Sequence, residues 1–136
     1  MSHLVGAWVA HRLYGSHEPE YQAIGLEHDG RLIAGARFEN WTGTSIVCHI
    51  AAEGRFTRSF LWTLCRFAFI QCGVSKLIAP VYSDNMRSLE MIRKMGFIEE
   101  TRLKDAQPHG DIIFFVLTPD RCRFLSPRYH RYWIGS

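Results

Sequence analysis

The feature that most constrains this fold is a short apolar strand enclosed between two helical patterns. Over residues 56–72 apolar side chains recur at three- and four-residue steps, and Gly73 follows as a helix stop. Residues 76–82 form a short apolar run. Asp84 or Asn85 then caps a second predicted helix, which Gly96 ends. A strand–helix–strand unit implies a parallel crossover, so we predict an α/β fold with a mixed sheet.

The other segments predict antiparallel strands around this unit. Apolar and turn residues alternate in the pattern of strands over residues 21–27, 31–39, 44–51, 97–104 and 111–118. Asp29-Gly30 favours a tight hairpin turn. Apolar spacing predicts a first helix over residues 4–13, and Thr118-Pro119 is expected to begin a short helix with the threonine as its cap. The predicted order is helix, three strands, long helix, strand, helix and two strands.

Length and composition fit one domain over residues 1–136, with 126–136 as a basic aromatic tail. Apolar residues make up 47% of the chain, which is enough for a core. The formal net charge of +3 permits an acidic ligand but does not require a nucleic acid. The chain shows neither a signal-peptide pattern nor an apolar run of about 18 residues, so we expect a cytoplasmic protein without a membrane span.

Cysteine spacing argues against a structural zinc site. Cys48, Cys65, Cys72 and Cys122 include no CxxC pair. We expect reduced core thiols and no bound metal.

One block of the second half carries a family pattern. The stretch runs from Val81 through Asn85 and Ser88 to Gly96-Phe97 and Glu100. It resembles the GCN5-related N-acetyltransferase (GNAT) superfamily, and most closely the branch that acetylates the N-termini of ribosomal proteins. The resemblance implies acetyl-CoA as cofactor and a central mixed sheet, flanked by helices, that splays between its middle strands. Pro80 agrees with such a split, because proline lacks the N–H that a central paired strand needs.

The resemblance also implies a phosphate-binding helix start, which this chain has in altered form. Residues 52–59 occupy the place of the family's glycine-rich loop, but Arg55 and Thr57 stand where two glycines are usual. Free N–H groups and the helix dipole attract an anion there, and the arginines and hydroxyls add donors. A solvated basic helix start is the alternative. The cofactor-binding candidates are Ile50, Ala51, Arg55, Phe56, Thr57, Arg58, Ser59, Asn85 and Ser88.

The catalytic candidates follow from the same resemblance. The family's usual tyrosine acid is replaced by Ile92, and Ser88 matches a serine placed near the thioester sulfur in the ribosomal-protein branch. For the base we consider His49, Glu53 and His109, since a histidine titrates near neutral pH when unperturbed. A backbone N–H near Ile50 or Ala51 would polarise the thioester carbonyl. No paired base is visible for Cys48 as an acyl nucleophile.

These residues support two readings. The first is an acetyl-CoA-dependent N-acetyltransferase that acts on a primary amine, on a protein N-terminus or lysine. The second is a catalytically inactive GNAT-fold module that binds proteins through the tail from Arg128 to Trp133. Of the uses of that tail, we favour docking on its own domain or on a second subunit in a homodimer. No motif supports nucleic-acid binding.

Overall fold

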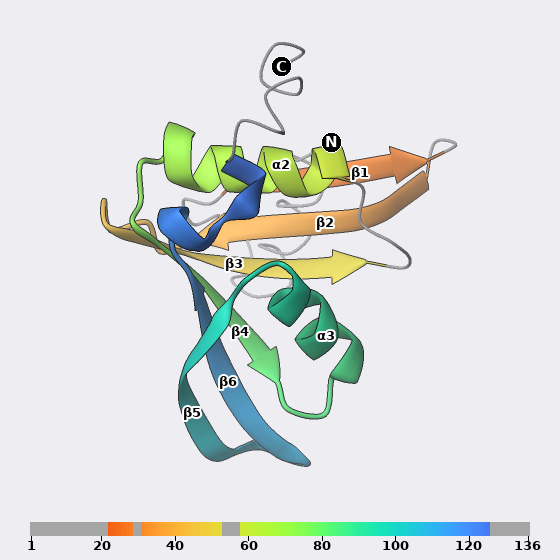
Figure 1. The fold of residues 1–136 in the computed structure, drawn as a ribbon. Coiled ribbons are helices and arrows are strands. Elements are labelled where there is room, and N and C mark those ends of the chain that lie inside the picture. The colour runs from red at the N-terminus through yellow and green to blue at the C-terminus, as the bar shows by residue number, and fades with distance from the viewer. Residues whose placement is uncertain (1–21, 29–30, 53–57, 126–136) are drawn as a thin grey trace, which may run out of the picture.

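The computed structural model describes residues 22–28, 31–52 and 58–125, and its centre is one six-stranded sheet (Figure 1). The strand order across the sheet is β1-β2-β3-β4-β6-β5. Among the strands of the described residues, only β3 and β4 pair in parallel, whereas the other neighbours are antiparallel. This confirms the predicted mixed α/β sheet. The strands are β1 Gln22–His28, β2 Arg31–Glu39, β3 Ser45–Ala52, β4 Lys76–Tyr82, β5 Ile98–Gln107 and β6 Gly110–Leu117.

The two predicted crossover helices are present, with one difference. Helix α2 (Arg58–Arg66) continues as a π-helix, η1 (Phe67–Gln71), so the predicted single helix changes its winding after its second turn. Gly73 follows with φ of 68°. Helix α3 spans Met86–Lys94, and Gly96, with φ of 103°, directs the chain into β5. Both glycines adopt backbone angles that are costly for residues with a Cβ.

The short helix predicted after Thr118 is not a continuous helix. Two separate 3₁₀ turns, η2 (Pro119–Arg121) and η3 (Arg123–Leu125), take its place. Cys122 between them has an extended backbone, with ψ of 101°, which interrupts the helical path. Thr118 occupies the predicted N-cap position with Pro119 in the first turn, but its side chain makes no capping hydrogen bond.

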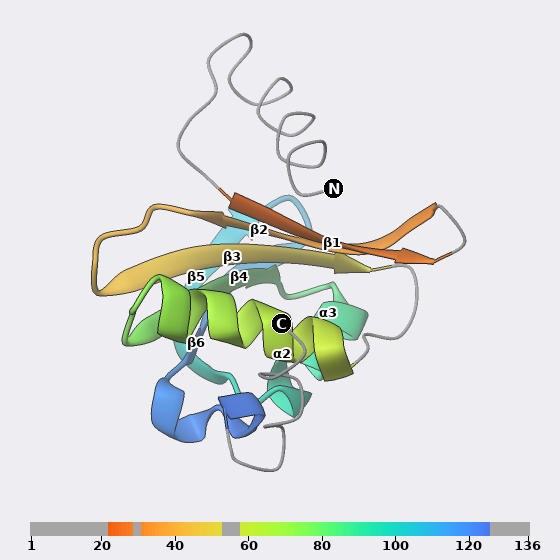
Figure 2. The same cartoon turned by 90° about the horizontal axis from the view of Figure 1, so that it is seen from above.

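Helices α2 and α3 both cover one face of the sheet, which we call the helix face (Figure 2). Alternate residues of the strands point into this layer and are buried, as period-two patterning requires. The ring of Phe38 on β2 lies 4.7 Å from that of Phe67 in η1, and the Arg93 guanidinium of α3 lies over Phe115 of β6. Within the described residues the buried set contains no polar or charged side chain.

The parallel ladder between β3 and β4 is short. It joins only three residue pairs, from Ser45 with Lys76 to Val47 with Ile78. Beyond these pairs β4 stays paired with β6 as far as Tyr82, while β3 stays paired with β2 as far as Ala52. Figure 1 shows β4 turning away from β3 at this point. The sheet is therefore split beside Pro80, as the family resemblance implied, and the missing N–H of the proline agrees with this position.

Three predicted features lie outside the described residues. They are the first helix over 4–13, the Asp29-Gly30 turn and the tail over 126–136. Among the helices of the described ranges, none has the length and apolar character needed to cross a bilayer.

Candidate active site at the split in the sheet

A cavity of about 380 Å³ lies where β3 and β4 separate, and we call it the sheet cavity. Its walls come from both strands, from α3 and from β6. The lining residues are Cys48, His49, Ile50, Ala79, Pro80, Val81, Tyr82, Asn85, Ser88, Met91, Ile92, Ile112 and Phe114.

The sheet cavity reaches both faces of the sheet. Cys48, Ala79 and Val81 are buried on the helix face, next to α3. Successive side chains of a strand point to opposite faces. His49 and Pro80 therefore belong to the other face, which we call the open face. A ligand in this cavity can thus be approached from α3 on one side and from the open face on the other.

His49 and Glu39 form a hydrogen-bonded pair on the open face. The Nε2–H of His49 donates to Oε1 of Glu39 at 2.7 Å, and the Nη2 atom of Arg37 lies 3.6 Å from the same oxygen. The register of β2 and β3 explains the pair, since Arg37 lies opposite His49 and Glu39 lies opposite Val47. When Nε2 of a neutral imidazole carries the proton and donates, Nδ1 carries a lone pair that can accept a proton. The arrangement is that of a base oriented by a carboxylate.

Sequence reasoning identified His49 but missed Glu39. The signal was present in the chain, because Glu39 ends the strand before His49. To recognise that Glu39 lies beside His49, one needs the register between the two strands, and the turn over residues 40–43 does not specify that register on its own.

The α3 side of the sheet cavity carries Asn85 and Ser88. Oδ1 of Asn85 accepts the backbone N–H of Ser88 at 3.2 Å, so Asn85 rather than Asp84 is the helix cap. Ser88 is half-buried at the cavity wall. Ile92, one turn further on, is only 2% exposed and adds an apolar wall where the family has its tyrosine.

Of Ile50, Ala51 and His109, which were also predicted site residues, only Ile50 lines the sheet cavity. Ile50 lines the cavity, whereas the exposed Ala51 does not. Both lie beyond the last β3–β4 pair, where β3 pairs with no strand of the described residues on that edge. His109 lies in the turn between β5 and β6 and is not among the lining residues, so the structure does not bring it to this site.

The predicted phosphate-binding segment over residues 52–59 is described only at its ends, where Ala52 closes β3 and Arg58 begins α2. Arg58, the first residue of α2, is exposed, and Ser59 follows it. Glu53, Arg55, Phe56 and Thr57 lie outside the described residues. Their roles stay predictions.

Cys48 is the cysteine that lines the sheet cavity, and it is buried. Burial raises the pKa of the Cys48 thiol to about 12, so it stays protonated although it lines the cavity. Cys65 and Cys122 are buried and hydrogen-bonded to each other, which raises the pKa of Cys65 and lowers that of Cys122. All four cysteines are free. The described residues contain no cluster of His, Cys, Asp or Glu that could hold a metal ion.

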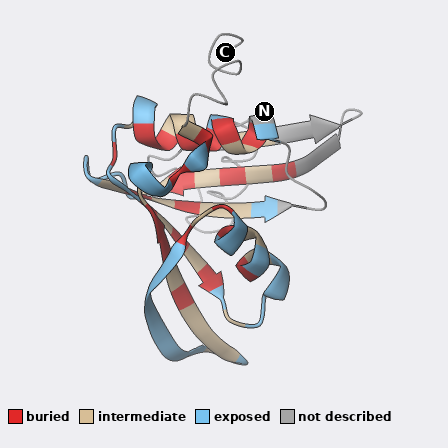
Figure 3. Cartoon of the chain, viewed as in Figure 1, coloured by how far each residue is buried: buried red, intermediate tan, exposed pale blue. Residues whose placement is uncertain are grey.

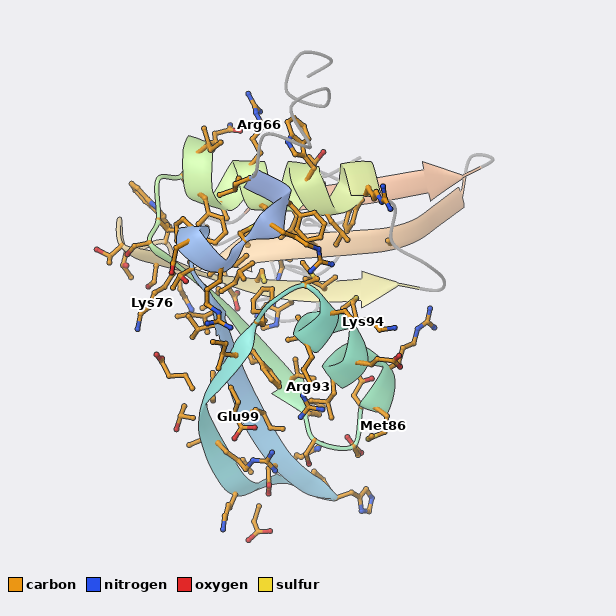
Figure 4. All side chains as sticks on the ribbon, in the orientation of Figure 1. Arg66, Lys76, Met86, Arg93, Lys94 and Glu99 are labelled. Carbon is orange, nitrogen blue, oxygen red and sulfur yellow. The ribbon has the colours of Figure 1, made fainter. Side chains whose placement is uncertain are left out.

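A second hollow, of about 730 Å³, lies along α3. Met86, Arg93 and Lys94 of this helix line it (Figure 4), and Lys94 is paired with Glu90 at 2.9 Å. All of its lining residues come from this one helix. It cannot enclose a ligand between elements as the sheet cavity does.

No protein-family model matches this sequence, and no curated protein matches it. Solved structures do share its fold. PseH from Campylobacter jejuni, an N-acetyltransferase solved with acetyl coenzyme A, is 19% identical with a TM-score of 0.59, over 86% of this chain and 77% of PseH. Mutant forms of the spermidine/spermine N-acetyltransferase SpeG from Vibrio cholerae are 16% identical with a TM-score of 0.65, over 87% of this chain and 76% of SpeG. YncA from Salmonella typhimurium, solved with its cofactor acetyl-CoA, is 18% identical with a TM-score of 0.63, over 85% of this chain and 72% of YncA.

The fold of this chain is therefore the GNAT fold. The split sheet and the Asn85-to-Phe97 block agree with that architecture. At these identities the match extends to the fold alone, and the predicted link to the ribosomal-protein branch stays a prediction.

Proposed function

We propose that this protein is an acetyl-CoA-dependent N-acetyltransferase that transfers an acetyl group to a primary amine. The observation that carries the proposal is the opened edge of β3, which faces α3 across the sheet cavity. Beyond Val47 this edge has no partner on β4, so its backbone groups can pair with the amide-bearing arm of the cofactor. The apolar walls of Ile50, Ala79 and Ile92 suit the methylene groups of that arm. The residues present thus fit the cofactor, which supplies a thioester-activated acetyl group when bound.

Each proposed residue has one task. His49 takes the proton of the acceptor amine at Nδ1, and Glu39 holds its ring through Nε2. A backbone N–H at Ile50 or Ala51 polarises the carbonyl to be attacked. Ser88 donates a hydrogen bond toward the leaving sulfur from the helix face.

The remaining proposed residues belong to cofactor binding. Asn85 presents the start of α3 to the cofactor, and the segment from Arg55 to Ser59 is proposed to hold its phosphates on helix N–H groups. Glu53 stays an alternative base. The open face of the sheet beside His49 supports a protein amine as acceptor, on an N-terminus or a lysine. We place the reaction in the cytoplasm, which the four free thiols support.

Cofactor binding can be tested by thermal stability. Acetyl-CoA at 100 times its Kd should add about 2.7 kcal/mol to the free energy of unfolding by mass action. Desulfo-CoA competes for the same site, whereas ATP is the control for a merely phosphate-driven effect. Equal stabilisation by ATP, or none by millimolar acetyl-CoA, would contradict the proposal.

Turnover can be tested by following acetylated product with a panel of amines. His49→Ala should lower kcat by about 10²–10⁴-fold, the usual contribution of a general base. Glu39→Gln should lower kcat and leave the KM for acetyl-CoA unchanged, with partial recovery in Glu39→Asp. Ser88→Ala should lower kcat. It should leave the free energy of unfolding unchanged, because the backbone N–H of residue 88 still donates to the Asn85 cap. Lys104→Ala on the exposed strand β5 serves as the matched control.

The second candidate function is a catalytically inactive binding module. Ile92, buried where the family has its proton donor, is the observation that favours it. In that case acetyl-CoA would stabilise the protein while no amine in the panel became acetylated.

A further inference from the structure

We propose that the acceptor is the amino terminus of a polypeptide whose first residue has a large apolar side chain. This inference rests on the proposed function and narrows its substrate. It follows from a row of apolar side chains that begins at the sheet cavity and continues across the open face. We call Pro80, Tyr82, Leu103, Ile112 and Phe114 the apolar platform.

The strand registers place these five side chains together. Tyr82 of β4 lies opposite Ile112 of β6, which lies opposite Leu103 of β5. One step nearer the split, Pro80 lies opposite Phe114. Side chains at directly opposite positions share a face and contact one another. The platform is therefore continuous from the rim of the sheet cavity to the outer edge strand.

His49 lies on the same face, across the split. The pairing of Val47 with Ile78 puts the alternate residues His49 and Pro80 on the same side of the sheet. An amine that reaches Nδ1 of His49 from the open face therefore has the apolar platform beside it.

The platform is accessible in the described part of the chain. Tyr82 is 53% exposed and Leu103 is 50% exposed, while Ile112 and Phe114 are half-buried. Figure 3 shows β5 exposed along its length, beside a β6 that begins with residues of intermediate burial and ends in buried ones. Exposed apolar side chains that adjoin one another mark interaction sites more often than scattered ones do.

The charges around the platform do not favour a polycationic acceptor. Among the described residues that line the sheet cavity, the ionisable ones are Cys48, His49 and Tyr82, and none of these is a carboxylate. The nearby carboxylate of Glu39 is held by His49 and Arg37, and Glu100 pairs with Lys76 at 3.1 Å. A polyamine would find each of these carboxylates already neutralised by a cation. One amine next to an apolar group fits better.

The shape favours a polypeptide over a small amine. Small-molecule sites are concave and bury most of their ligand. The platform is instead a sheet face that spans three strands. An N-terminal residue carries its side chain on the carbon that bears the amine, so the side chain contacts the platform while the nitrogen reaches His49. The amine of a lysine lies four methylenes from its backbone, which would hold the rest of the peptide away.

The test compares five acceptors with the full-length protein at saturating acetyl-CoA, with products measured by mass spectrometry. Two peptides are identical except for Phe or Ser as the first residue. The others are an N-terminally blocked lysine peptide, phenethylamine and spermidine. We expect kcat/KM for the Phe-first peptide to exceed that for the Ser-first peptide by about 10-fold or more, the discrimination usual for apolar contacts.

Tyr82→Ser and Leu103→Ser should reduce that ratio to below about 3-fold, in line with the loss of apolar contact. Both side chains are half-exposed, so the variants should fold. Ile70→Ser removes another exposed apolar side chain, 45% exposed on η1, and should leave the ratio unchanged.

Equal rates for the two peptides, or preference for the lysine peptide or spermidine, would overturn this inference and leave the proposed function intact. Phenethylamine turned over as well as the Phe-first peptide would show a small arylalkyl amine as the acceptor instead. If acetyl-CoA neither stabilises the protein nor acetylates any acceptor, the proposed function fails, and this inference fails with it.

Discussion

Replacing Gly96 by alanine tests whether the end of α3 is held in a conformation that only glycine adopts easily. Gly96 has φ of 103°, and a Cβ built there would lie 3.2 Å from the carbonyl oxygen of Arg121 and 3.5 Å from Cδ1 of Leu117. A positive φ costs a residue with a Cβ about 1–3 kcal/mol. The close carbonyl belongs to the backbone and cannot rotate away, so the turn η2 or the end of α3 must shift.

Gly73→Ala is the matched control. Gly73 also has a positive φ, of 68°, but a Cβ there would meet no atom within 4 Å. Both changes reduce the freedom of the unfolded chain equally, by about 0.4–1 kcal/mol. The difference between the two variants therefore reports the crowding and the more extreme angle at Gly96. We expect Gly96→Ala to lose about 2–3 kcal/mol and Gly73→Ala about 1 kcal/mol.

The assay is urea unfolding followed by circular dichroism, with the slope of free energy against urea checked for each variant. A shift of the midpoint at constant slope reports stability alone. Equal losses in the two variants would refute the reasoning about the Arg121 carbonyl. No loss in Gly96→Ala would refute the backbone angle itself.

Three further predictions concern the helix cap, the thiols and the response to acid. Asn85→Ala should lower the free energy of unfolding by about 1 kcal/mol, whereas Asn85→Asp should keep the cap, as measured by urea unfolding. At pH 8 a thiol reagent should label the half-exposed Cys72 first and leave Cys48, whose pKa burial raises to about 12, unlabelled until urea is added; Cys72→Ser should remove the early phase. The backbone N–H of Asp105 lowers the pKa of Asp111, so this carboxylate stabilises the fold above its unfolded-state pKa and the stabilisation is lost as pH falls through the folded-state pKa. Asp111→Asn should therefore be less stable than the wild type at pH 6, with a difference that shrinks toward pH 3, and a difference independent of pH would contradict this assignment.

The features that sequence predicted well depend on local rules. Gly73 and Gly96 end helices because of their own backbone freedom, and Asn85 caps α3 through a residue three positions away. Pro80 agreed with the split that the family resemblance implied, because a missing N–H is a property of one residue. These signals act within one turn or one strand, so they can be interpreted without knowing what packs where.

The features that sequence missed depend on contacts between distant segments. The Glu39–His49 pair and the apolar platform follow from strand registers, and a shift of one residue would move these side chains to the other face. The π-helix η1 continues the apolar stripe of α2, and periodicity alone does not distinguish the two windings. The change of path at Cys122 interrupts a segment whose local pattern favoured one helix.

A passage through the sheet has a kinetic consequence. If the cofactor enters beside α3 and the amine enters beside His49, neither ligand blocks the route of the other. Both can be present at once in a ternary complex, so the acetyl group can pass directly to the amine without an acyl-enzyme intermediate. Initial-rate plots at several fixed acetyl-CoA concentrations should then intersect, whereas parallel lines would indicate an acyl-enzyme and a different use of this cavity.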